Sequence, residues 1–93
     1  MQIVVVGVDH TTAPITLREQ LACSPRQVSQ ILGATQQVAQ EAILLSTCNR
    51  LELYAVCTEE EHDARANLLR VLSEIRQVPL AELEIHSYHF IDE

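Results

Sequence analysis

The fold is decided by residues 42–57, which read AILLSTCNRLELYAVC. The first four residues form a short apolar run that is typical of a strand. In residues 50–57 apolar side chains occupy every second position. On an extended chain they fall on one face: Leu51, Leu53, Ala55 and Cys57. Only residues 46–49 separate the two runs, so the pattern predicts a β-hairpin with a polar tip.

Upstream of this hairpin, the sequence predicts one strand and two helix starts. Residues 3–8, IVVVGV, are typical of a central strand buried on both faces, in which Gly7 marks a close backbone approach or a bulge. Capping boxes predict helix starts at Thr16 and at Ser24, the second with proline at its first helical position. Gly33 within the second helix is interpreted as a tight contact between helix and sheet.

Downstream of the hairpin, a capping box at Thr58 predicts a helix that ends at Val78, before Pro79. Residues 80–83 add one more helical turn, and residues 84–90 are predicted to form the last strand. The order β-α-β-β-α-β is that of an α+β ferredoxin-like sandwich, with a four-stranded antiparallel sheet and helices on one face. In this topology the first strand lies between the third and fourth. Its end, near His10, is then at the same end of the sheet as the hairpin tip.

Composition limits the classes of function. The length of 93 residues and the apolar content of 47% predict a single domain, residues 1–93. The net charge of -7 excludes a domain that holds nucleic acid by its phosphates alone, so an RNA partner would be gripped mostly elsewhere. No membrane span and no signal peptide are expected. Three cysteines without paired spacing predict a reducing, cytoplasmic compartment.

Cys48 lies in a polar turn, whereas Cys23 and Cys57 are interpreted as small buried apolar residues. Cys48 is either an ordinary turn residue or a nucleophile. Arg50 favours the second hypothesis, because a nearby guanidinium stabilises a thiolate and its fork suits a substrate carboxylate. Arg50 could equally pair with Glu52 at the strand edge.

The neighbours of Cys48 are open to two interpretations. Thr47 and Asn49 either shape the turn or stabilise a developing oxyanion. His10 is either structural or a base or substrate ligand near the tip. The spacing of cysteines and histidines predicts no metal site, and no glycine-rich loop predicts a nucleotide site in these residues.

Two stretches resemble the signature of the glutamyl-tRNA reductase family. They are GVDHTTAP at residues 7–14, continuing through Leu17-Arg18-Glu19, and LSTCNR at residues 45–50, followed by Glu52-Leu53-Tyr54. The resemblance covers the whole chain. It implies the N-terminal catalytic domain of an NADPH-dependent enzyme that converts glutamyl-tRNA(Glu) to glutamate-1-semialdehyde, the first step of tetrapyrrole (porphyrin) biosynthesis.

The same resemblance implies roles for individual residues. Cys48 would attack the ester and form a thioester, Thr47, Asn49 and Arg50 would bind substrate, and Arg50 would grip the glutamate carboxylate. The family's NADPH-binding domain, its dimerisation domain and its important histidine would lie beyond residue 93, so these residues alone are expected to lack reductase activity.

The partners that the family implies are glutamyl-tRNA(Glu), a second copy in a homodimer, and glutamate-1-semialdehyde aminomutase, which would receive the product. The compartment would be the cytoplasm, or the plastid in a plant. A different class stays open, namely a non-catalytic ferredoxin-like module that binds a metabolite, RNA or protein.

Overall fold

The computed structural model describes residues 2–58 and 61–92. The strands are β1 (Gln2–Asp9), β2 (Glu41–Ser46), β3 (Arg50–Cys57) and β4 (Tyr88–Asp92). The helices are α1 (Ile15–Leu21), α2 (Pro25–Thr35), α3 (Glu61–Arg76) and α4 (Leu80–His86). Each helical segment of the predicted order is thus a pair of helices.

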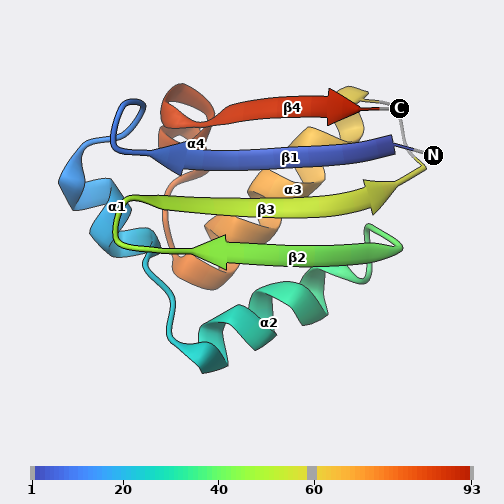
Figure 1. The fold of residues 1–93 in the computed structure, drawn as a ribbon, viewed down its shortest axis with the longest axis horizontal. Helices are drawn as coiled ribbons and strands as arrows, with labels where there is room; N and C mark the ends of the chain where they lie inside the picture. Colours follow the sequence, from blue (N-terminus) through green and yellow to red (C-terminus); the bar gives the residue numbers. More distant parts are fainter. Residues whose placement is uncertain (1, 59–60, 93) are drawn as a thin grey trace.

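The four strands form one antiparallel sheet in the order β2-β3-β1-β4. Strand β1 therefore lies between the third and fourth strands, as predicted. Figure 1 shows the strands side by side in front, with α3 behind them and α2 along the β2 side. The helices occupy one face of the sheet, and the predicted ferredoxin-like sandwich is confirmed.

The core lies between the sheet and these helices. From β1 it takes Val4 and Val6, both fully buried, which belong to the same apolar cluster as Leu68 and Leu72 of α3. The opposite side of the sheet, here called the open face, is lined with side chains that alternate with the core positions. Several large apolar groups are exposed there: Ile3, Ile43, Leu45 and Phe90. The prediction that the first strand is buried on both faces is therefore wrong at Ile3, which is 46% exposed.

One of the predicted capping boxes is present in the structure and another is not. Ser24 caps α2 as predicted, since its Oγ accepts a hydrogen bond from the backbone N–H of Gln27 at 3.3 Å. The capping box predicted at Thr16 is wrong, because α1 begins at Ile15 after Pro14, which has the N-cap position. The fixed φ of proline suits a helix start without a side-chain cap. The box predicted at Thr58 involves Glu59 and Glu60, which lie outside the described residues.

The last part of the chain also departs from the prediction. Residues 84–86 are helical, and β4 begins only at Tyr88. Alternation is a weak signal over so few residues, and the helix continues until the N–H of Ser87 donates to the carbonyl of Leu83 at 2.9 Å. Helix α3 ends at Arg76, two residues before the predicted end, because Gln77 adopts a left-handed conformation with φ 55°.

The two glycines have opposite surroundings. A Cβ built on Gly7 would lie 2.7 Å from the backbone oxygen of Leu51, 2.9 Å from Cγ of Glu52 and 3.1 Å from Cζ of Tyr88. Strand β1 thus needs glycine where it passes between its neighbours, and the predicted close approach is confirmed. Around Gly33 nothing lies within 4 Å of such a Cβ, so the tight contact predicted there is wrong.

These surroundings predict opposite effects of the same substitution. Gly7→Ala should lower the free energy of unfolding by about 1–3 kcal/mol, because the added methyl meets backbone that cannot move aside. Gly33→Ala should raise it by up to about 1 kcal/mol, since alanine is the better helix former and has room. Urea unfolding of both variants measures the two effects. A Gly7→Ala chain as stable as the wild type would contradict the close packing described.

Candidate active site

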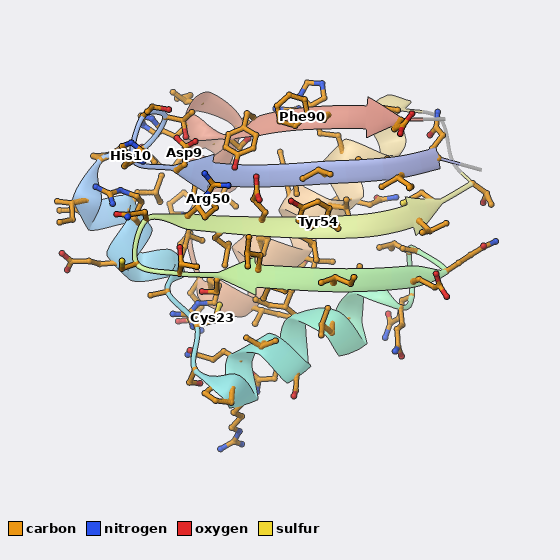
Figure 2. All side chains as sticks on the ribbon, in the orientation of Figure 1. Asp9, His10, Cys23, Arg50, Tyr54 and Phe90 are labelled. Atoms are coloured by element: carbon orange, nitrogen blue, oxygen red, sulfur yellow. The ribbon has the colours of Figure 1, made fainter. Side chains whose placement is uncertain are left out.

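Three segments meet at one end of the sheet. Asp9 at the end of β1 pairs with Arg50 at the start of β3, and Gly7 pairs with Tyr88 at the start of β4. The turn after β1, the hairpin tip and the start of β4 therefore lie together, as the topology predicted. Figure 2 shows Asp9, His10 and Arg50 grouped at this end, with Tyr54 further along β3.

The hairpin tip is organised by Thr47. Its backbone N–H donates to the carbonyl of Arg50 at 2.8 Å. Its hydroxyl oxygen accepts from the backbone N–H groups of Asn49 and Arg50 at 3.3 and 3.2 Å. The turn is therefore held by a threonine hydroxyl. Among the described non-glycine residues only Gln77 has a positive φ, so Asn49 does not supply a left-handed turn conformation.

Cys48 is exposed at this tip. Its backbone carbonyl accepts a hydrogen bond of 3.5 Å from Nη1 of Arg18, whose Nε donates to the carbonyl of Ala13 at 3.3 Å. Helix α1 thus ties the tip to the body of the domain and brings a second guanidinium to its base. Sequence reasoning missed Arg18 as part of the site, because 30 residues separate it from Cys48 and no local pattern joins them.

Arg50 projects onto the open face of the sheet (Figure 2). It lines a shallow hollow of about 170 Å³ together with Asp9, Glu52, Tyr88 and Phe90. Its Nη1 lies 3.8 Å from Oε1 of Glu52. The pairing with Glu52 that the sequence left open is thus present, and half of the Arg50 side chain stays exposed.

Glu52 is the buried polar group of this region. It is 7% exposed, and its two oxygens accept hydrogen bonds from the hydroxyls of Tyr54 at 2.9 Å and Tyr88 at 2.5 Å. The hydrogen bond to Glu52 raises the pKa of Tyr54. Burial, and then the same kind of bond, raises the pKa of Tyr88. Sequence reasoning placed neither Glu52 nor Tyr88 in the site. The sequence offered Glu52 only as a possible partner of Arg50 and as part of the family stretch.

The histidines are placed differently. His10 is exposed in the turn after β1, next to Asp9, at the same end of the sheet as Cys48. Asp9 shapes this turn by accepting hydrogen bonds from Thr11 and Thr12, and those from Thr11 lower its pKa most. His86 belongs to α4, with its Nδ1 3.2 Å from the carbonyl oxygen of Thr12.

A larger hollow of about 630 Å³ lies at the other end of the sheet, where its lining includes Ile3, Glu41 and Val56. None of the tip residues lines it, so we place the candidate site at the Cys48 end. Among the described residues, no three His, Cys, Asp or Glu side chains are grouped to hold a metal ion. None of the described helices is long and apolar enough to cross a bilayer.

Comparison with known proteins places the chain in a family. Residues 6–93 match the family described as "Glutamyl-tRNAGlu reductase, N-terminal domain". The chain belongs to the glutamyl-tRNA reductase family. It is 44% identical over 93 residues to the glutamyl-tRNA reductase of Herpetosiphon aurantiacus, covering all of this chain and 22% of that protein.

A second relative is the glutamyl-tRNA reductase of Citrifermentans bemidjiense, which is 39% identical over 92 residues. The alignment covers 97% of this chain and 21% of that protein. The chain thus spans about a fifth of the length of these curated relatives. The resemblance seen in the two sequence motifs is confirmed at the level of the family.

The three cysteines should react at different rates. Cys48 is exposed, Cys57 is fully buried in the core, and burial raises the pKa of the half-buried Cys23, whose thiol donates to the carbonyl of Leu21 at 3.1 Å. Iodoacetamide at neutral pH should therefore modify Cys48 first in the native chain, while Cys57 reacts only after unfolding. Mass spectrometry of tryptic peptides follows each site. Equal rates at Cys48 and Cys57 would contradict the described exposure.

Proposed function

We propose that this chain is the N-terminal catalytic domain of a longer, NADPH-dependent glutamyl-tRNA reductase. The enzyme converts glutamyl-tRNA(Glu) to glutamate-1-semialdehyde, the first step of tetrapyrrole biosynthesis. One observation carries this proposal: a family match across the chain that coincides with an exposed Cys48 two residues from a half-exposed Arg50. A non-catalytic binding module is not favoured, because relatives similar over the whole chain are named as reductases.

The first chemical step uses groups on the hairpin. The Cys48 thiolate attacks the carbonyl carbon of the glutamyl ester, so that a C–S bond forms and the bond to the ribose oxygen of the tRNA breaks. The released tRNA hydroxyl takes up a proton, and the glutamyl group stays on Cys48 as a thioester. Covalent capture divides one difficult reduction into two easier steps.

The neighbouring residues have distinct tasks in this proposal. Arg50 faces the hollow on the open face and receives the side-chain carboxylate of the glutamyl group. Asn49 directs its side-chain amide to the oxyanion that develops during attack. Thr47 and Arg18 keep the tip in place through their hydrogen bonds to its backbone. His10, in the turn at the same end of the sheet, is proposed as a substrate ligand.

The residues described do not fit a dinucleotide. Strand β1 leads into the turn of residues 10–14, and α1 has Pro14 as its N-cap, where a dinucleotide-binding unit has a glycine-rich loop. We therefore propose that NADPH, which supplies the reducing equivalents, is bound outside these residues. No semialdehyde is then expected from these 93 residues alone.

The acidic balance of the domain bears on its partners. With a net charge of -7, it offers little attraction for tRNA phosphates. We propose that the longer enzyme grips the tRNA backbone elsewhere, forms a homodimer through another domain, and passes its aldehyde to glutamate-1-semialdehyde aminomutase. The proposed compartment is the cytoplasm, or the plastid in a plant.

Variants of the full-length enzyme test the roles of Cys48 and Arg50. With glutamyl-tRNA and no NADPH, mass spectrometry should find a glutamyl adduct on Cys48, absent in Cys48→Ser and retained in Cys23→Ser. Arg50→Lys should lower kcat/KM about 30-fold, equivalent to about 2 kcal/mol, because lysine keeps the charge but loses the fork.

Two outcomes would contradict the proposal. An adduct on another residue would exclude Cys48 as the nucleophile, and an Arg50→Lys enzyme with wild-type kcat/KM would exclude the carboxylate grip.

A further inference from the structure

Glu52 is a nearly buried carboxylate on a sheet face that is otherwise open. An unpaired carboxylate in such a place is costly, and it is retained only where donors compensate for the lost water. Here both oxygens are used: Oε1 accepts from Tyr54 and Oε2 accepts from Tyr88. The two hydroxyls come from β3 and β4, on either side of β1.

The site for this carboxylate depends on Gly7. A Cβ at that position would lie 2.9 Å from Cγ of Glu52 and 3.1 Å from Cζ of Tyr88, so any other residue would displace the pair. The glutamate and the tyrosine therefore fill the space that glycine leaves above β1. This arrangement fixes the carboxylate relative to the sheet and, through Tyr88, to the start of β4.

Arg50 lies close to the Glu52 carboxylate but does not form a hydrogen bond with it. Its Nη1 lies 3.8 Å from Oε1 of Glu52, which is an ion-pair distance but too long for a hydrogen bond. To form a bidentate pair with the guanidinium, the carboxylate would have to turn, and this would break its hydrogen bonds to the two tyrosines. Within residues 2–58 and 61–92, the side chain of Arg50 makes no hydrogen bond, and 47% of it is exposed.

We propose that Glu52 is a positioning residue that holds the Arg50 guanidinium over the hollow and leaves its N–H donors to a ligand carboxylate. Tyr54 and Tyr88 hold Glu52 in turn. This inference rests on the proposed function, in which that ligand is the side chain of the glutamyl ester. The direct consequence concerns substrate selectivity. A guanidinium that is out of place no longer favours a substrate with a charged side chain over one with a neutral side chain.

The test compares two substrates in the full-length enzyme: the same tRNA charged with glutamate or with glutamine. Glu52→Gln keeps the size of the side chain and removes its charge. It should lower kcat/KM for glutamyl-tRNA about 10-fold to 100-fold, since a displacement of about 1 Å can cost that much, and change the glutaminyl value little. The ratio of the two values therefore falls by a similar factor.

Glu41→Gln is the matched control. It removes the same charge from the same face, at an exposed position of β2 that pairs with Val56 near the other end of the sheet. Its selectivity ratio should equal that of the wild type. Combining Glu52→Gln with Arg50→Lys should cost less than the sum of the single changes, because both act on one contact.

The outcomes separate the inference from the function on which it rests. A wild-type enzyme that does not react with glutamyl-tRNA refutes the proposed reductase function. The positioning role is refuted if the wild type is active and Glu52→Gln lowers kcat/KM equally for both substrates, or leaves the ratio of the two values unchanged. If Glu52→Gln does not fold, Tyr88→Phe removes one anchor and should lower the ratio in the same direction. An unchanged ratio there also refutes the inference.

Discussion

At Gly7 the two strands beside β1 come so close that a side chain on that residue would collide with both. The backbone oxygen of Leu51 stands on the β3 side and the ring of Tyr88 on the β4 side. The missing side chain leaves room for Glu52 and Tyr88 at the end of the sheet where the hairpin tip lies. Glu52 occupies the space above Gly7, and Arg50, two residues earlier on the same face, lies 3.8 Å from it.

The arrangement places a buried charge where the fold could have had an apolar residue. Desolvation of a carboxylate is unfavourable, and an ion pair at 3.8 Å with a half-exposed arginine offsets only part of it. The two tyrosine hydroxyls donate a hydrogen bond to each oxygen and so replace water that is lost on burial. Stability alone does not favour such a cluster over aliphatic residues. In the proposed role, the cluster instead holds the Arg50 guanidinium over the hollow on the open face.

The sequence was sufficient for the parts that depend on local pattern. Alternation in residues 50–57 correctly separated the core face from the open face, and the hairpin followed from the short interval before it. The sequence prediction failed at residues 84–86, where one apolar residue between two polar ones fits a helix as well as a strand. It also failed at Thr16, because the helix begins at Ile15 with Pro14 as its N-cap. These errors moved element boundaries and left the topology intact.

The candidate site also has one part that the sequence predicted and another that it did not. Cys48 and Arg50 share one hairpin, so their proximity could be read directly from the chain. The contact of Tyr88 with Glu52 spans 36 residues and depends on the register of β4, and Arg18 reaches Cys48 across 30. Neither contact has a local signature, because each arises only when the sheet and helix α1 are assembled.

The ultraviolet absorbance of the two tyrosines reports on the cluster of Glu52, Tyr54 and Tyr88. Both donate to Glu52, and the chain has no tryptophan to mask their ultraviolet absorbance. Folding raises the pKa of each, so the unfolded chain releases these protons first. The stability they contribute is therefore fully present below the ordinary tyrosine value of about 10 and declines above it.

A spectrophotometric titration of the native chain, compared with Glu52→Gln and with the urea-unfolded chain, tests whether both tyrosines are bound to Glu52. Both native tyrosines should ionise above the unfolded midpoint, and Glu52→Gln should move their midpoints down towards it. Native tyrosines that ionise at the unfolded midpoint, or that ignore Glu52→Gln, would contradict the account.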